Sequence, residues 1–480
     1  MSGRSGYDRL EAVSATDPST SRFREVERKF DVDAEAISPS FDGIAGVAHV
    51  EQLPAQDLAA VYFDTPGHDL AARRITLRRR TGGPDAGWHL KLPAGPDTRT
   101  EVRAPLGPEI PEELLDVVRA IVRDRPLAPV ARIDTARGVV VLRDDHGEAL
   151  AEFCDDQVTA SAGDDAQQHW REWELELGCG DLELLDRLSN RLLDTGAGPA
   201  GYGSKLARVL GAAPAPAHPT DRLHRALAEQ IDQLLVWDRA VRADADDAVH
   251  QMRVTIRRIR SLLQGEETAH APLLDELQEL GAVLGVARDA EVLAQRYQQA
   301  LDELTPELVR GPVGERLVGG SLRRYETGRR RSLAAMRSPR YFRLLDGLDE
   351  LISAPAAERY ATVDIAYRRV RKAVKAAKKA ADRDVALHRI RKAAKRLRYA
   401  AAAANKKKIA KRAKTIQTVL GDHQDSVVSR AHLLHQADAA AAAGEDTFTY
   451  GLLYAREADL AARSRAALRP ALRKLKRAVR

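Results

Sequence analysis

Aromatic residues, cysteines and long apolar runs are all scarce in this chain of 480 residues. Phe, Trp and Tyr make up 5% of the residues, although 44% are hydrophobic, so aliphatic side chains must build most of the cores. The two cysteines, Cys154 and Cys179, lack the spacing of a metal site or a disulfide framework, which favours a reducing cytoplasmic location. No apolar run approaches the length of a membrane span, so the sequence predicts no membrane segment.

Charge is distributed unevenly along the chain. Residues 1–210 carry 25 Lys/Arg and 37 Asp/Glu, whereas residues 211–480 carry 51 and 33. The segment 1–21 has no apolar core and is predicted to be a disordered leader rather than a signal peptide. The Pro/Ala-rich segment 211–220 interrupts the periodic pattern and is predicted to be a linker. We therefore predict an acidic domain at 22–210 and a basic domain at 221–480 with different functions. A polyanion is the candidate partner of the second.

Residues 22–210 are typical of short strands separated by turns, with helices at 111–124 and 181–194. In the stretch EVERKF, residues Glu25, Glu27 and Lys29 share one strand face, opposite Val26, Arg28 and Phe30. Other segments repeat this division into a charged and an apolar face: the charged members are Arg78 and Arg80; His89 and Lys91; Arg99, Glu101 and Arg103; and Glu172, Glu174 and Glu176. The charged faces could meet water in a two-sheet sandwich or line the lumen of a closed barrel, and periodicity does not separate these two.

Several of these motifs resemble the CYTH domains, the triphosphate tunnel metalloenzymes, in order and spacing. The resemblance covers roughly residues 22–210. The matching motifs are the Glu-x-Glu-x-Lys of Glu25, Glu27 and Lys29; Tyr62-Phe63-Asp64-Thr65; Arg78 and Arg80; Lys91; Arg132 and Arg137; Asp155-Asp156; Glu174 and Glu176; and Ser204-Lys205.

This resemblance implies an antiparallel eight-stranded β tunnel with flanking helices that binds a linear triphosphate with one or two Mg²⁺ or Mn²⁺ ions. The implied substrate-binding residues are Lys29, Arg78, Arg80, Lys91, Arg132, Arg137 and Lys205, although Arg132 lies on the opposite strand face from Arg137. The implied metal ligands are Glu25, Glu27, Asp156, Glu174 and Glu176, and the catalytic set is Glu25, Glu27, Lys29, Glu174 and Glu176. Phosphoryl transfer needs positioning and charge neutralisation more than a covalent nucleophile, so these residue types suit the chemistry.

The second domain reads as helical throughout and contains an internal repeat. The segment from His250 to Arg260 matches that from His388 to Arg398, and Leu284-Gly285 matches Leu420-Gly421 at nearly the same offset. Four basic residues in each copy fall on one narrow helical stripe: His250, Arg253, Arg257 and Arg260, and His388, Arg391, Lys395 and Arg398. Like charges at this spacing repel by some tenths of a kcal/mol per pair, which a bound polyanion would relieve.

These repeats resemble the CHAD domain, the conserved histidine α-helical domain, over about 221–480. The resemblance implies two duplicated four-helix bundles with a basic groove for inorganic polyphosphate. The whole chain is thus predicted to be α+β, with an all-α second domain. The two stripes are the predicted polyphosphate-binding residues, and their histidines are expected to donate to phosphate rather than hold a metal.

We therefore expect a cytoplasmic, metal-dependent hydrolase of inorganic triphosphate or short polyphosphate, with polyphosphate granules as a candidate partner. The alternatives are a tunnel enzyme acting on a nucleoside or thiamine triphosphate, and a granule protein that binds without turnover. Nucleic acid is not expected as the partner of the basic half, because aromatic stacking positions are scarce there.

Overall fold

The computed structural model describes residues 21–163, 165–211, 221–263, 270–353 and 363–479. The chain divides into two compact units, residues 1–218 and 219–480, which are described separately below. The predicted leader at 1–21 and the predicted linker at 211–220 lie almost entirely outside the described residues.

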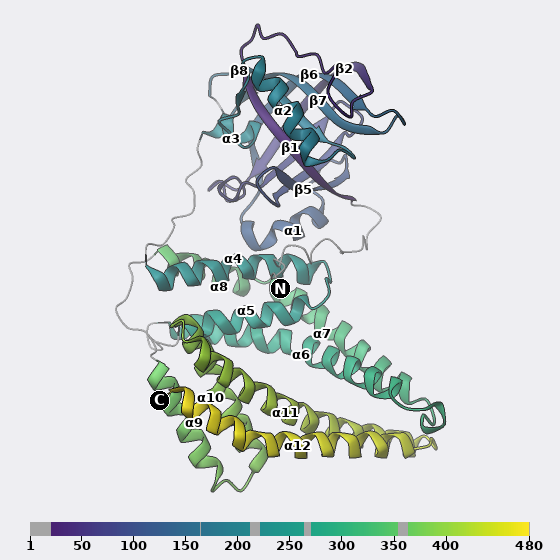
Figure 1. Ribbon diagram of the computed structural model, residues 1–480, viewed down its shortest axis with the longest axis vertical. Helices are drawn as coiled ribbons and strands as arrows, with labels where there is room; N and C mark the ends of the chain where they lie inside the picture. Colours follow the sequence, from purple (N-terminus) through teal and green to yellow (C-terminus); the bar gives the residue numbers. More distant parts are fainter. Residues whose placement is uncertain (1–20, 164, 212–220, 264–269, 354–362, 480) are drawn as a thin grey trace. The chain divides into compact units, whose positions relative to one another are not determined.

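The first unit is a closed antiparallel β barrel (Figure 1). Neighbouring strands follow the order β5-β4-β3-β2-β6-β7-β8-β1, and β1 closes the barrel by pairing with β5 through its first half and with β8 through its second half. A two-residue strand, β9 (Gly198–Pro199), pairs with β1 outside this circuit. The eight barrel strands are β1 (Ser21–Val32), β2 (His49–Asp64), β3 (Thr76–Thr81), β4 (Gly87–Pro93), β5 (Thr98–Pro105), β6 (Ala128–Arg143), β7 (Ala149–Ser161) and β8 (Gln168–Leu177).

Alternation along the strands places apolar side chains on the outer face of the barrel, where one helix packs against them. Phe30, Trp173 and Leu175 face outward and pack with Leu184 and Leu188 of α2 (Leu182–Asp194). Asp181 begins α2 as its N-cap, because its side chain accepts a hydrogen bond from the backbone N–H of Leu184. The other flanking helix, α1 (Glu112–Val122), follows β5, and a 3₁₀ turn, η2 (Ala71–Arg73), follows β2.

A short helix at the end of the unit, α3 (Lys205–Leu210), packs against residues that face into the barrel. Its Leu206 and Val209 contact a cluster that includes Tyr62 and Ile133, and both of these side chains also line the lumen. The Ser204 hydroxyl caps α3 by accepting from the N–H of Ala207 at 3.1 Å. This helix therefore enters the barrel from one side and brings Lys205 to the interior.

The second unit is helical, in agreement with the prediction. In the described residues its first half contains α4 (Arg222–Arg242), α5 (Ala248–Leu263), α6 (Ala271–Asp302), α7 (Gly320–Met336) and α8 (Pro339–Ser353), with a 3₁₀ turn η3 (Pro306–Leu308) and a π-helical turn η4 (Glu315–Gly319) before α7. Its second half contains α9 (Val363–Ala377), α10 (Arg383–Ala403), α11 (Lys407–Ala442) and α12 (Phe448–Val479).

The sequence repeat corresponds to a structural one. The offset of 136–138 residues relates α5 to α10 and α6 to α11. Helix α8 is additional to the four helices α4–α7 that correspond to α9–α12. Within the described part of the chain, no helix is both long enough and apolar enough to cross a membrane.

Candidate tunnel site and basic groove

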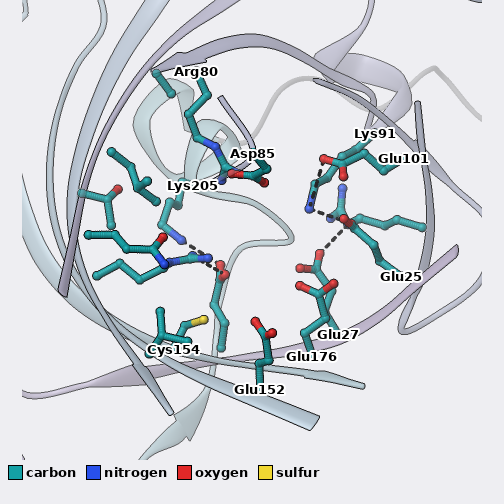
Figure 2. A pocket seen from close by; sticks show the side chains of 18 of the residues that line it. Glu25, Glu27, Arg80, Asp85, Lys91, Glu101, Glu152, Cys154, Glu176 and Lys205 are labelled. Atoms are coloured by element: carbon teal, nitrogen blue, oxygen red, sulfur yellow. Dashed lines mark hydrogen bonds and ion pairs between the residues drawn. The ribbon is translucent and has the colours of Figure 1, made fainter. Parts of the chain in front are cut away.

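The barrel encloses a cavity of about 410 Å³, and every one of the eight barrel strands contributes side chains to its wall (Figure 2). The charged rows seen in the sequence therefore line the lumen of a closed barrel, which decides between the two arrangements that periodicity left open. The basic lining residues are Lys29, Arg78, Arg80, Lys91, Arg99, Arg103, Arg137 and Lys205. The acidic lining residues are Glu25, Glu27, Asp85, Glu101, Glu152, Glu174 and Glu176.

Strand β1 supplies the row Glu25, Glu27 and Lys29, and its register aligns this row with that of β8. Glu27 lies opposite Glu176, and Lys29 lies opposite Glu174. The intervening Arg28 points away from the cavity, where its guanidinium contacts Asp97 at 2.9 Å and Asp186 at 2.7 Å. The two-residue period thus separates a tunnel-facing row from an outer ion pair within six residues.

The ammonium group of Lys205 sits among three buried carboxylates. Its Nζ lies 2.8 Å from Asp156, 2.7 Å from Glu172 and 2.7 Å from Glu174. Oxygens of these three acids lie within 4.8 Å of one another, a spacing that suits a metal ion. Because the ammonium already contacts all three, this cluster holds Lys205 in place, and a metal could enter it only by displacing the lysine.

Two further cations converge on Glu174. Lys29 donates to Glu174 and, at 3.0 Å, to Glu27, while Arg137 contacts Glu174 at 2.8 Å and Asp156 at 2.6 Å. Burial alone would raise the pKa of Glu174, but Lys205, Lys29 and Arg137 together lower it well below its usual range. This wall of the tunnel is therefore a closed network of paired charges.

A second group of acids is less completely neutralised. Among the described residues, the structure gives no ion pair to Glu152 or Glu176. Burial, opposed by Lys91, raises the pKa of Glu176, and the neighbouring Glu27 adds to this rise. Burial also raises the pKa of Glu25 to about 7, despite an ion pair with Lys91 at 2.6 Å.

This group fits a divalent cation better than the cluster around Lys205 does. Mg²⁺ and Mn²⁺ prefer carboxylate oxygens, which Glu25 and Glu176 of this group supply from adjacent strands together with Glu27, an acid that already pairs with Lys29 and Arg99. Burial raises the pKa of Glu25 and of Glu176, although Glu25 pairs with Lys91 and Arg103, and this favours further positive charge beside them. A bound cation would provide it.

The wall opposite this group is basic. Arg78 donates to the hydroxyl of Tyr62 at 3.2 Å, and Arg80 forms an ion pair with Asp85. Burial, together with the like charges of Arg78 and Arg137, lowers the pKa of Arg80 to about 9. These guanidiniums present forks that match the oxygens of a phosphate chain.

The second unit carries its own concentration of basic residues, where α5 and α10 contact each other. All eight residues of the two predicted stripes are half-buried, whereas the adjacent Arg258, Arg389, Lys392 and Arg396 are exposed. We call these eight residues the basic groove, after the feature that the sequence predicted.

The basic groove brings like charges together from both helices. Burial is the largest cause that lowers the pKa of Lys395 on α10 to about 7, followed by Arg257 on α5 and then Arg391. Burial also lowers the pKa of Arg257, and Arg391 acts on it from the opposite helix. Burial and nearby cations likewise lower the pKa of His250 and of His388. The two stripes therefore form one electrostatic cluster.

Both halves of the groove seat an arginine over a glycine. A Cβ atom at Gly285 on α6 would lie 3.3 Å from Arg253 Nη2, and one at Gly421 on α11 would lie 3.5 Å from Arg391 Nη2. Arg253 also pairs with Asp289 at 3.0 Å. The repeat has thus preserved space for the guanidiniums as well as the guanidiniums themselves.

Comparison with known proteins agrees with both halves of this description. A model of the CYTH domain matches residues 24–198, and a model of the CHAD domain matches residues 225–434. The uncharacterized protein Rv2226 of Mycobacterium tuberculosis (strain H37Rv) is 63% identical over 96% of this chain and 98% of its own length. The chain belongs to the CYTH–CHAD family. The predicted order of a CYTH domain followed by a CHAD domain is therefore confirmed.

Solved structures similar to parts of this CYTH–CHAD protein fall into two groups. The CHAD domain from the plant Ricinus communis is 26% identical, with a TM-score of 0.41, over 54% of this chain and 92% of that one. PptA from Streptomyces chartreusis is 20% identical, with a TM-score of 0.44, over 54% and 100%. The putative adenylyl cyclase HpAC1 from Hippeastrum, described as having a dominant triphosphatase activity, is 21% identical, with a TM-score of 0.26, over 39% and 95%.

The structure of the CYTH domain brings most of the predicted tunnel residues to one cavity. Two of them lie elsewhere. Arg132 is on the outer face, where its guanidinium pairs with Asp134 at 3.2 Å and its side chain is 64% exposed. It lies five residues before Arg137 on the same strand, an odd separation that turns it to the opposite side of the sheet. Asp156 does not line the cavity, but its fully buried carboxylate holds Arg137 and Lys205 there.

Some lining residues of this domain were not among the predicted site residues. Arg99 contacts Glu27 at 2.9 Å, and Arg103 pairs with Glu101. Alternation in the sequence placed Arg99, Glu101 and Arg103 on one face of β5, which was enough to indicate that they line the tunnel. They match none of the motifs of the resemblance. Tyr62 was part of a matching motif without an assigned role, and Asp85 gave no signal because it lies in a loop.

Proposed function

We propose that the CYTH domain hydrolyses inorganic triphosphate or short polyphosphate with a divalent metal ion, and that the CHAD domain binds polyphosphate. The observation that carries the first part is the enclosure of eight basic and seven acidic side chains within one closed barrel. Basic groups at this density suit a chain of phosphates, and acids beside them suit the metal that such chemistry uses.

Each wall of the tunnel has a role in this proposal. The cations Lys29, Lys91, Arg137 and Lys205 would exchange their carboxylate partners for phosphate oxygens, and Arg78, which donates to Tyr62, would bind phosphate beside them. Arg80, paired with Asp85, would add its positive charge at the end of this row. Glu25, Glu27 and Glu176 would hold Mg²⁺ or Mn²⁺, with Glu174 keeping Lys29 and Lys205 in position. A bound divalent ion would supply positive charge to the phosphate oxygens and acidify a water molecule.

Two substitutions test the tunnel assignment. Glu25→Ala removes an acid of the less neutralised group, and Glu174→Ala leaves Lys29, Lys205 and Arg137 without a shared partner. We expect both to abolish phosphate release from tripolyphosphate with Mg²⁺ or Mn²⁺. Arg132→Ala serves as the control, because its side chain lies outside the cavity and activity should persist. Full activity in both glutamate variants would contradict the assignment.

A substrate panel separates this proposal from its rivals. Pyrophosphate, triphosphate, long polyphosphate, ATP and thiamine triphosphate would be compared. Tyr62 is the one aromatic residue among the residues that line the cavity, which disfavours recognition of a base or a thiazolium ring by stacking. Release of a nucleoside product from ATP would favour the adenylate cyclase alternative. Association with polyphosphate granules without turnover on any member would favour a binding protein.

The basic groove supports the second part of the proposal. Its half-buried cations lower one another's pKa, so a polyanion would relieve their mutual repulsion. Competition between polyphosphate and DNA for the full chain tests this preference, with cytoplasmic polyphosphate granules as the proposed location. Equal or stronger retention of DNA would contradict it.

A further inference from the structure

The loop between β3 and β4 extends over the tunnel cavity. Its residues Pro84 and Asp85 both line the cavity wall. Gly82 and Gly83, which begin the loop, have φ angles of +79° and +72°, a region that other residues rarely adopt. A Cβ at Gly82 would lie 1.9 Å from the carbonyl oxygen of Asp57 on β2, so only glycine permits this close approach. The loop is therefore seated tightly against β2.

Hydrogen bonds fix Asp85 within this loop. Its backbone carbonyl oxygen lies 2.9 Å from Nε2 of His89, and Nδ1 of His89 lies 2.9 Å from Glu101. His89 is 1% exposed, so it forms a buried link between β5 and the loop. The Asp85 side chain then points inward to the guanidinium of Arg80 (Figure 2).

Arg80 occupies a position that requires an anion. Its side chain is 8% exposed, and the neighbouring cations Arg78 and Arg137 act against its charge. Among the ion pairs within the described residues, Asp85 is the acid that contacts Arg80. The carboxylate therefore fills the place at which a phosphate group would bind this guanidinium.

We propose that Asp85 is a specificity-determining residue that ends the phosphate chain in the tunnel at Arg80. The inference rests on the proposed function and deepens it, because it concerns the length of the substrate. A chain reaching only Lys29, Lys91 and Arg137 leaves the Asp85–Arg80 pair intact. A longer chain would bring a further phosphate against the Asp85 carboxylate, and two anions in a cavity of low dielectric repel strongly. The tunnel thereby selects for short chains.

The test measures chain-length selectivity in the full chain. Asp85→Asn keeps the shape of the side chain and removes its charge. Asp57→Asn is the matched control, because it makes the same change on the adjacent strand, on a side chain outside the cavity. The kcat/KM values for tri-, tetra- and pentaphosphate are measured with Mg²⁺, and binding of the same three compounds is measured by calorimetry without metal.

We expect Asp85→Asn to raise the ratio of tetraphosphate to triphosphate kcat/KM about tenfold, and Asp57→Asn to leave this ratio unchanged. Asp85→Ser should give the same direction of change if the amide disturbs the loop. An unchanged ratio in both Asp85 variants, or an equal change for every length, would overturn the proposal.

Failure of the proposed hydrolysis can be distinguished from failure of the proposed role of Asp85. If the wild type releases no phosphate from any compound, the proposed hydrolysis is wrong. The role of Asp85 is then decided by the calorimetric ratios, to which the CHAD domain contributes equally in all variants. A binding ratio that rises in Asp85→Asn supports the end-stop role, and one that does not change refutes it.

Discussion

The two domains arrange their basic residues in opposite ways. In the tunnel, Lys29, Lys205 and Arg137 each contact buried carboxylates, and the lining contains nearly as many acids as bases. In the basic groove, Lys395 and Arg257 lie among other cations, and these neighbours lower their pKa values. The tunnel is thus neutralised from within, whereas the groove is not.

This difference predicts two modes of anion binding. An anion entering the tunnel must exchange with existing ion pairs, and a cation must take over the released acids. An anion reaching the groove removes a repulsion and releases counterions. The first mode couples phosphate to metal, and the second makes binding sensitive to salt and pH.

The largest expected effect comes from breaking the internal neutralisation of the tunnel. Lys205→Met would leave Asp156, Glu172 and Glu174 without their shared ammonium in a buried site. Removing one partner of a buried pair costs about 3–5 kcal/mol, so we expect a loss of that order in the free energy of unfolding. Urea denaturation would measure it, with Lys205→Arg as the charge-conserving control. A Met variant as stable as the wild type would show that the acids are not held by this lysine.

A smaller effect is expected from ionic strength, which should weaken binding to the basic groove more than binding in the tunnel. If about four groove cations meet phosphates, raising salt from 50 to 200 mM should weaken long-polyphosphate binding on the order of a hundredfold. Arg257→Gln should reduce the slope of log affinity against log salt by about one contact. The KM of the tunnel for triphosphate should change much less, because buried pairs are screened weakly. Equal salt slopes for the two processes would remove the distinction between the domains.

A third effect, about tenfold, concerns pH. The pKa of Lys395 is lowered to about 7, so its amine is charged below that pH and increasingly neutral above it. The charged form binds the anion, so affinity for polyphosphate should fall as pH rises from 6 to 8. The pKa values of His250 and His388 are lowered, which shifts their protonation toward lower pH. Lys395→Arg should flatten the profile measured by calorimetry, and a slope that persists in this variant would assign the titration to another group.

The sequence predicted those features of the tunnel that depend on a two-residue period. Glu25, Glu27 and Lys29 face inward while Arg28 does not. On β8, Glu176 lies opposite Glu27 and Glu174 lies opposite Lys29. The sharing of three acids by Lys205 was not predictable, because it depends on the register of β7 and β8 and on the entry of α3 into the barrel.

In the helical domain, the repeat predicted each stripe on its own helix. The proximity of Lys395 to Arg257 depends on how α5 and α10 meet, which a helical period does not specify. Asp85 was not predicted for a related reason: it lies in a loop, where no strand or helix period indicates the direction of a side chain.

Gly285, beneath the groove arginine Arg253, places thermostability and ligand affinity in opposition. Alanine is more favourable than glycine in a helix interior by about 1 kcal/mol, so Gly285→Ala would stabilise α6. The added methyl group would lie 3.3 Å from the Arg253 guanidinium, which would have to shift by a few tenths of an ångström, whereas the same change at Gly421 would make ordinary contact with Arg391. Selection for heat resistance alone would therefore favour alanine at Gly285 and disturb the position of Arg253 without altering any charge.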